Sequence, residues 1–471
     1  MSTRPGRTAV VAVCGAAVLA FLVRLPFVFV GLGMDEGGYA YVARRWAEGA
    51  TPYRQAWLDR PQGLLLAYRG LLAVDGSGWT VRLGAALCGV VVTVALGACG
   101  RLLLGRRAAV AAAGTYAIVG VAPHLEGFTL NGELLASTAA TVAVALALAW
   151  RSTGRVRWLV GAGLAAGAAV TMKQSGVDGG LACLAVVLVT GRGWPDRLRH
   201  TGILAGAALV PVAASVLHGW AVGLGAYWRA LAGYQLAAAG PDRWHTFLAS
   251  LPRSAMDLLV PVAVAAVGGY LLRRRRAELT VALAWLAAAL VGAGLGGSWW
   301  PHYYVQLLPP LVLLAAAAIA QPRRGLLHGA VAVLPTLVWL LALVPMNQTQ
   351  REHAIPYYRR TRVDERVAAA VRARTTPGQQ IYALSSEANV YFLAHRDTTY
   401  PYLWGMPMAK IPSALPDLRT LLAGPHRPTL VLVYSPADRV DPSGRLGAVL
   451  AAHYRADGSV DGIPFLRATG R

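Results

Sequence analysis

The sequence predicts a polytopic α-helical membrane protein that carries a small α/β domain at its C-terminal end. Of its 471 residues, 56% are hydrophobic and only 14% are charged, whereas soluble domains carry about 25% charged residues. Long apolar segments recur as far as residue 345, and the remainder of the chain changes to short helical and strand patterns. These observations divide the chain into a transmembrane domain, residues 1–345, and a second domain, residues 346–471.

About eleven apolar segments are expected to cross the membrane, because a spanning helix needs about 20 mostly apolar residues. They are residues 8–32, 79–104, 107–122, 133–150, 157–172, 176–190, 200–217, 251–272, 278–297, 302–320 and 325–345. The first segment is followed by Gly-Met-Asp-Glu and not by a small-residue cleavage site. We therefore expect it to be a retained anchor and not a signal peptide.

The basic residues predict the orientation. A net charge of +22 would suggest a nucleic-acid partner for a soluble protein, but here the arginines gather in alternate loops between spans, as the positive-inside rule expects of cytoplasmic loops. The intervening loops at 123–132 and 298–301 carry no Lys or Arg. We expect a multi-pass protein of the cell membrane, with a cytoplasmic N-terminus, an extracytoplasmic C-terminal domain and no nucleic-acid partner.

The acidic residues have a one-sided distribution. Of twelve acids before residue 350, ten fall in or near the outward-facing segments. They are Asp35, Glu36, Glu48, Asp59, Asp75, Glu126, Glu133, Asp178, Asp242 and Asp257. Because orientation rules barely constrain Asp and Glu, a polar cavity that opens outward is the simplest explanation.

Residues 33–78 form an outward segment that is too long for a simple turn, and loops of this length are usually functional or disordered. Residues 38–50 have the spacing of an amphipathic helix that lies in the interface plane, and residues 64–74 have the same character. In the tail, helices are expected at 364–374, 416–423 and 445–453, and strands at 380–384 and 429–434. The tail contains no glycine-rich phosphate loop and no nucleophile elbow, which favours a binding or packing role.

The adjacent carboxylates Asp35 and Glu36 follow the first apolar segment directly. Such a pair is either a solvated helix end or part of a substrate cavity, since carboxylates are costly in hydrocarbon. Asp59 and Arg60 place an acid and a base together where the long outward segment returns to the membrane. Glu133 opens a helix from outside, a position where a carboxylate is electrostatically favoured in any case.

Lys173 is one of only two lysines among 44 basic residues, and it ends a span on the outer side. An ammonium is a compact charge that suits a phosphate oxygen, although a lysine here could also simply snorkel to the interface. His302 lies between two pairs of aromatic residues at the mouth of another span. It belongs either to an aromatic belt or to a site that binds a phosphate or a sugar hydroxyl.

Together these features resemble the bacterial GT-C membrane glycosyltransferases related to the protein O-mannosyltransferases and aminoarabinose transferases. The matching motifs are Asp35-Glu36 with Tyr39, Asp59-Arg60-Pro61, Asn131-Gly132-Glu133, Met172-Lys173-Gln174, and Pro301-His302-Tyr303-Tyr304 with Pro309-Pro310 beyond. They follow the family's order over about the first 320 residues. The resemblance implies a GT-C fold and an inverting transfer of a sugar from a polyprenyl-phosphate carrier to a lipid, glycan or protein acceptor.

By this resemblance Asp35 is the general base and Glu36 supports the catalytic site, in the outward loop 33–78. Lys173, Arg60 and His302 are the candidate ligands of the donor phosphate, and Tyr39, Asp59 and Glu133 are the candidate substrate-binding residues. Two positions depart from the family pattern: Gly38 replaces an arginine often found three residues after the first acid, and Gln62 replaces the usual second proline of the first-loop motif.

Two other functions remain open on the sequence. A transporter or flippase of lipid-linked glycans would carry ionisable residues near the bilayer midplane and often paired repeats with broken helices, and a non-catalytic scaffold would use its outer domain to recruit partners. The cysteines have no metal-ligand spacing. No metal ligand is assigned, and whether a divalent cation acts as a cofactor is left open.

Overall fold

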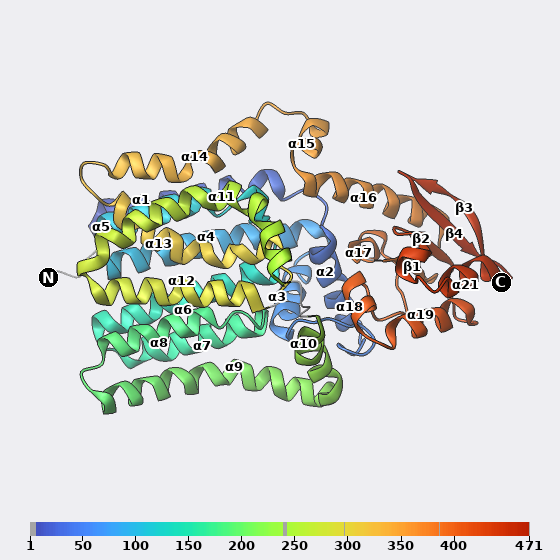
Figure 1. Cartoon of the computed structure of the whole chain (residues 1–471), viewed down its shortest axis with the longest axis horizontal. Coiled ribbons are helices and arrows are strands. Elements are labelled where there is room, and N and C mark those ends of the chain that lie inside the picture. Colours follow the sequence, from blue (N-terminus) through green and yellow to red (C-terminus); the bar gives the residue numbers. More distant parts are fainter. Residues whose placement is uncertain (1–5, 239–242, 296, 386, 471) are drawn as a thin grey trace.

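The computed structural model describes residues 6–238, 243–295, 297–385 and 387–470. Helices side by side form one elongated body, and the C-terminal part of the chain, from residue 346 onward, sits at one end of it (Figure 1). The body contains α1 (Arg7–Leu22), α4 (Gly78–Leu103), α5 (Arg106–Val119), α6 (Gly132–Thr153), α7 (Val156–Met172), α8 (Asp178–Thr190), α9 (Trp194–Trp228), α11 (Arg243–Leu271), α12 (Arg276–Leu295), α13 (Leu308–Ile319) and α14 (Gly325–Leu343).

Each of the apolar segments that the sequence predicts as a span overlaps one of these helices. Among the described residues, eight helical segments are long and apolar enough to cross a membrane. This is fewer than the eleven spans expected, because α5, α7 and α8 are shorter helices. The first span is interrupted after α1 by the 3-10 turn η1 (Leu25–Phe27). Arg24 is the N-cap of this turn, and Pro26 lies within it. The expected polytopic helical membrane fold is therefore confirmed. Asp242, expected near the outer side, lies outside the described residues.

The long outward segment forms two helices, α2 (Met34–Ala47) and α3 (Gln62–Leu72), at the end of the body that faces the C-terminal part (Figure 1). The helix expected at 38–50 begins four residues earlier than expected. Gly33 is its N-cap, and the Glu36 carboxylate accepts a hydrogen bond from the Gly33 backbone N–H. The acid pair thus lies in the first turn of α2. The same end of the helical body holds η2 (Pro123–Leu125), the π-helical turn η3 (Arg229–Gly233), α10 (Tyr234–Ala238) and η5 (Pro301–Leu307).

The C-terminal part is built on a four-stranded sheet of order β1-β2-β4-β3. Its strands are β1 (Ile381–Leu384), β2 (Leu430–Val433), β3 (Tyr454–Val460) and β4 (Ile463–Ala468). Strands β1 and β2 are parallel, and the other neighbours are antiparallel. The remaining short element of the body is η4 (Leu272–Arg274). The helices of the C-terminal part are α15 (Gln348–Ala354), α16 (Pro356–Arg374), α17 (Asn389–Ala394), α18 (Gly405–Lys410), α19 (Ala414–Ala423), α20 (Ala437–Val440) and α21 (Arg445–His453).

The predicted strands 380–384 and 429–434 correspond to β1 and β2, while the β3–β4 hairpin was not predicted. Its two-residue turn is Asp461-Gly462, and both residues have positive φ (49° and 79°). Asp-Gly is a strong sequence signal for this type of turn. The flanking strands, however, are mostly exposed or half-buried, β3 consists mainly of polar residues and β4 contains Pro464. The hydrophobic pattern therefore does not indicate them.

Candidate active site at the acid pair

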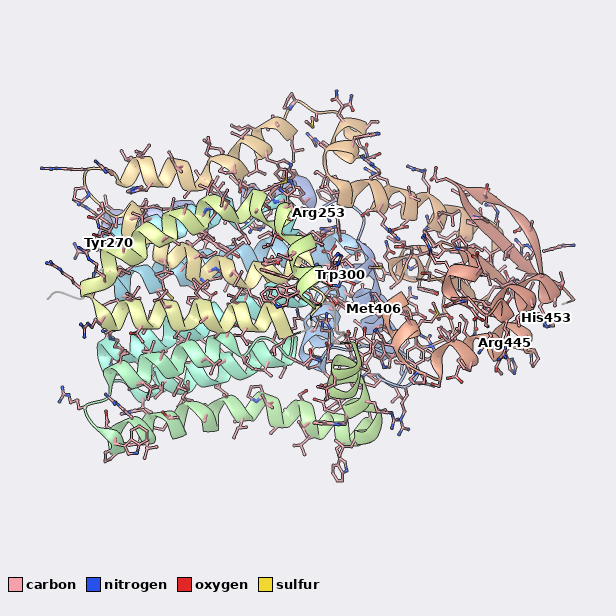
Figure 2. All side chains as sticks on the ribbon, in the orientation of Figure 1. Arg253, Tyr270, Trp300, Met406, Arg445 and His453 are labelled. Atoms are coloured by element: carbon pink, nitrogen blue, oxygen red, sulfur yellow. The ribbon has the colours of Figure 1, made fainter. Side chains whose placement is uncertain are left out.

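A cavity of about 1230 Å³ lies between the helical body and the C-terminal part, and the acid pair lines it. Asp35, Glu36, Tyr39, Asp59, Arg60 and His302 are among its lining residues. Figure 2 labels three further lining residues at this junction, Arg253, Trp300 and Met406. Glu133 and Lys173 are not among the lining residues that the structure describes.

Asp35 is the more accessible member of the acid pair, with 30% of its side chain exposed. Its Oδ1 accepts a hydrogen bond of 2.9 Å from the indole Nε1–H of Trp404, and its Oδ2 lies 3.9 Å from Nε2 of His302. Burial raises the pKa of the Asp35 carboxyl, whereas the charges of His302 and Arg60 and the Trp404 hydrogen bond oppose that shift. One carboxylate oxygen therefore faces the cavity beside a histidine without a direct hydrogen bond to it.

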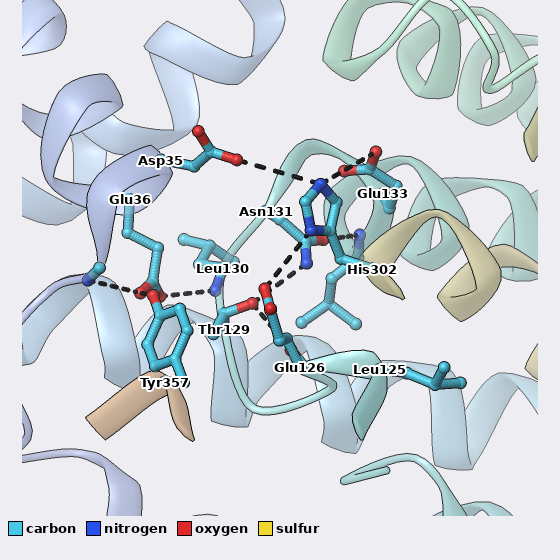
Figure 3. A network of polar contacts seen from close by, with 12 residues as sticks. Asp35, Glu36, Leu125, Glu126, Thr129, Leu130, Asn131, Glu133, His302 and Tyr357 are labelled. Atoms are coloured by element: carbon cyan, nitrogen blue, oxygen red, sulfur yellow. Dashed lines mark hydrogen bonds and ion pairs between the residues drawn. The ribbon is translucent and has the colours of Figure 1, made fainter. Parts of the chain in front are cut away.

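Glu36 is buried, and both of its carboxylate oxygens are bonded to protein groups (Figure 3). Its Oε2 forms an ion pair of 3.0 Å with Arg82 of α4 and accepts 2.7 Å from the Tyr357 hydroxyl, and its Oε1 accepts 2.8 Å from the Leu130 backbone N–H. These partners come from three distant segments of the chain. Glu36 therefore has a structural role, because it connects these segments around the site.

Replacing Glu36 by Ala should therefore destabilise the protein strongly. The change leaves the Arg82 guanidinium, whose side chain is 0% exposed, without its carboxylate, and breaking a buried ion pair in this way typically costs about 3–5 kcal/mol. Thermal unfolding of the detergent-purified protein measures the loss. Glu48→Ala is the matched control, because that glutamate ends the same helix and forms only partly exposed ion pairs with Arg44 and Arg45. Equal stability of the two variants would contradict this account.

His302 lies among three carboxylates (Figure 3). Its Nδ1 is 3.4 Å from Glu126, and its Nε2 is 3.9 Å from both Asp35 and Glu133. Glu126 has a left-handed backbone conformation (φ 56°), which is uncommon for a residue other than glycine and often marks a functional site. Despite this cluster, the described residues contain no group of three or more His, Cys, Asp or Glu side chains arranged to hold a metal ion.

Lys173 and Glu133 form a buried ion pair next to two lining residues, Tyr303 and His302. The Lys173 ammonium lies 3.5 Å from the centre of the Tyr303 ring, a cation–π contact. Burial lowers the pKa of Lys173 to about 8, against the opposing effect of Glu133. The sequence suggested separate positions for these two residues, whereas the fold joins them across the first turn of α6 and the end of α7.

Arg60 and Asp59 also form a pair, at 2.5 Å. Asp59 accepts a second hydrogen bond of 2.9 Å from Gln235 of α10, while the Nε of the buried Arg60 has no hydrogen-bond partner among the described residues. An unpaired donor that is buried in this way is costly. The Arg60 side chain also lines the cavity, where it is a candidate cation for an anionic ligand.

The two departures from the family pattern have local explanations. Gln62 is buried and bonds to α9, where it donates to the Ser215 carbonyl at 3.1 Å and accepts from the Ser215 hydroxyl at 2.5 Å. At Gly38, an added Cβ would overlap Cζ2 of the Trp404 ring. No larger residue fits there while Trp404 keeps its place.

The sequence did not reveal the contributions of the C-terminal part. Trp404 and Tyr357 reach the acid pair from more than 300 residues away, and no local pattern identifies them. Glu126 was counted among the outward acids but was not assigned to the site. The only sequence signal for a place of Glu126 in the site is its position six residues before the motif Gly132-Glu133.

Comparison with known proteins identifies the fold. Residues 59–220 match the family model described as dolichyl-phosphate-mannose-protein mannosyltransferase. ArnT from Cupriavidus metallidurans in the apo state superposes with a TM-score of 0.65 at 18% sequence identity. The structure of ArnT bound to undecaprenyl phosphate superposes with a TM-score of 0.64 at 17% identity. Each match covers 97% of this chain and 97% of ArnT. Archaeal oligosaccharyltransferase AglB from Archaeoglobus fulgidus, in complex with an inhibitory peptide and a dolichol-phosphate, gives 0.54 at 13% identity over 98% of this chain and 74% of AglB.

No curated protein sequence matches the chain. The family model covers the first-loop return, the start of α6 and the Lys173 region, which are three of the five motifs on which the resemblance rests. The structural matches extend the similarity over nearly the whole chain. The chain therefore has the fold of ArnT over nearly its whole length, in agreement with the membrane fold that the sequence predicts.

Proposed function

We propose that this protein is an inverting glycosyltransferase that moves a sugar from a polyprenyl-phosphate donor to an acceptor at the outer face of the cell membrane. The proposal rests on one observation: Asp35 and Arg60 line the same cavity at the end of the membrane helices. The C. metallidurans enzyme of the same fold has been seen with undecaprenyl phosphate. In the proposed orientation the N-terminus is cytoplasmic and the C-terminal part extracytoplasmic.

In the proposed reaction, the Asp35 carboxylate accepts the proton of an acceptor hydroxyl as its oxygen attacks the anomeric carbon of the sugar. The bond between that carbon and the phosphate oxygen breaks, and the polyprenyl phosphate leaves with the electron pair. Attack from the side opposite the leaving group inverts the anomeric centre. Glu36 positions Asp35 by fixing the first turn of α2 through Arg82 and Tyr357.

The leaving phosphate needs cations, because electrostatic stabilisation of the developing charge usually contributes more to such catalysis than any other effect. Arg60 and His302 line the cavity, and the Lys173 ammonium lies against the ring of the lining residue Tyr303. For Lys173, binding the phosphate means exchanging part of its contact with Glu133. Tyr39 and Asp59 line the cavity beside these groups and are proposed to contact the sugar, with Glu133 behind them.

The direct test is transfer of labelled sugar from a polyprenyl-phosphate donor by the purified protein. Because the acceptor is unidentified, lipid, glycan and peptide fractions are offered in parallel, and polyprenyl phosphate release is measured in each. Sugar transfer with stoichiometric release of polyprenyl phosphate is expected. No release with any fraction or with water would contradict the proposal.

The pH dependence of kcat/KM for the donor should be bell-shaped. Activity falls as the pH falls through the raised pKa of Asp35, because only the carboxylate accepts a proton. Activity also falls as the pH rises through about 8, because the pKa of Lys173 lies there and the side chain then loses the charge that attracts the phosphate. The matched variant is Lys173→Arg, whose guanidinium stays charged and should remove the alkaline limb. An alkaline limb unchanged by Lys173→Arg would rule out this role for Lys173.

A further inference from the structure

We propose that Trp404 is a positioning residue for Asp35, so that the C-terminal part completes the catalytic site of the membrane body. The inference rests on the proposed function of Asp35. It also gives the C-terminal part a defined contribution to catalysis, namely one indole N–H.

The two carboxylate oxygens of Asp35 have different partners. Trp404 Nε1–H donates to Oδ1 at 2.9 Å, whereas Oδ2 is the oxygen that faces His302, at 3.9 Å. A carboxylate that is held at one oxygen has a fixed plane, so its other oxygen has a defined direction for accepting a proton. Trp404 is therefore placed to orient the base while it leaves the reactive oxygen free.

The fold makes room for this indole on α2. At Gly38, an added Cβ would overlap the Trp404 ring and would lie 2.8 Å from the Cβ of Ala388, so glycine permits the close approach. On the next residue, the Tyr39 ring packs at a centroid distance of 5.9 Å from Trp404. The indole thus takes the space that an arginine at position 38 would occupy.

Other contacts hold the C-terminal part against the same helix. Arg44 and Arg45 of α2 each form an ion pair with Asp397, at 3.0 and 2.9 Å. At the other end of the helix, the Asn389 side chain donates 3.1 Å to the Leu32 carbonyl, just before the acid pair. Contacts at both ends of α2 therefore fix the position of Trp404 relative to Asp35.

A hydrogen bond to a carboxylate favours its charged form, so the indole supports a base that must be ionised. The other charged groups around Asp35 are His302 and Arg60, which also favour the carboxylate, and Glu133, which opposes it. Removing the indole N–H leaves these three in place. The acid limb of the pH profile should then move upward, an effect that simple loosening of the fold does not produce.

Trp404→Phe removes the N–H and retains an aromatic ring. We expect kcat for sugar transfer to fall about tenfold with the donor KM nearly unchanged, and the acid limb to shift upward by about one pH unit. Trp79→Phe is the matched control, because Trp79 also donates its indole N–H to an aspartate, Asp75, at 3.3 Å on the surface. A Trp404→Phe profile that coincides with that of Trp79→Phe would overturn the proposal.

Gly38→Ala provides a second variant that leaves both Asp35 and Trp404 intact. Its methyl group displaces the indole, so it should reproduce the slower kcat and the shifted acid limb. Gly70→Ala is its control, since a Cβ at that helical glycine meets no atom within 4 Å. Wild-type kinetics in Gly38→Ala would count against the assigned role of the contact.

A measurement without turnover separates this proposal from the proposed function. In protein with ¹⁵N-labelled tryptophan, the Trp404 indole signal, assigned with Trp404→Phe, should titrate with pH, and Asp35→Asn should abolish the titration. An indole signal that changes neither with pH nor in Asp35→Asn would overturn the proposed contact between Trp404 and Asp35. A signal that titrates as expected, in a protein that transfers no sugar, upholds the contact and overturns the glycosyltransferase proposal instead.

Discussion

Asp35→Asn should reduce sugar transfer by a factor of about 10² to 10⁴, the usual contribution of a positioned general base. The amide has nearly the same shape and can still accept the Trp404 N–H through its oxygen, so the site should keep its geometry. It cannot take the proton of the acceptor hydroxyl, however. The measurement is the initial rate of transfer from a labelled polyprenyl-phosphate sugar, with thermal unfolding as the check on folding.

The matched control is Asp75→Asn. Asp75 is another acid of the outward segment 33–78, but it is exposed and bonds only locally, to Ser77, Trp79 and the Thr80 hydroxyl. We expect that variant to transfer sugar at the wild-type rate. Full activity in Asp35→Asn would remove Asp35 from the role of base and leave the catalytic carboxylate unassigned.

Lys173→Met should raise the apparent KM for the lipid donor at least tenfold, because one charge-assisted contact to a phosphate is worth about 1.5–3 kcal/mol. The same change leaves Glu133 buried and unpaired. Loss of one partner of a buried pair typically costs about 3–5 kcal/mol of stability. A weaker interaction with the donor and a weaker fold would therefore appear together in this variant.

The double variant Lys173→Met/Glu133→Gln separates the two effects. It removes both charges, so most of the lost thermal stability should return, because replacing a whole buried ion pair is often nearly neutral. The donor KM should stay raised, since the phosphate still lacks its ammonium. If the KM returns to the wild-type value together with stability, Lys173 serves the fold through Glu133 and does not bind the donor.

The positions of the helices could be predicted from the sequence because the length and polarity of a span are local properties. Each predicted span overlaps a helix, and Asp35, Arg60 and His302 line one cavity. The partners of these residues could not be predicted. Trp404 and Tyr357 meet the acid pair only because the C-terminal part packs on α2, and such long-range packing leaves no periodic signal in a single sequence.

The pairing of Glu133 with Lys173 is a second example. These residues are 40 positions apart, at the start of α6 and directly after α7. In the sequence each has a local explanation of its own, as a helix-end carboxylate or a snorkelling lysine. Adjacent antiparallel helices bring the start of one next to the end of the other. The sequence supplies both charges, but only the arrangement of the helices makes them neighbours.

The central claim is that the cavity cleaves a lipid-linked sugar donor, and proteoliposomes test it most directly. The protein is reconstituted with a labelled polyprenyl-phosphate sugar, and donor cleavage and movement of intact donor between leaflets are measured in the same vesicles, for wild type and Asp35→Asn. The account predicts polyprenyl phosphate release by the wild type, its loss in Asp35→Asn, and no movement of intact donor. Movement of intact donor without cleavage would contradict it and would identify a transporter.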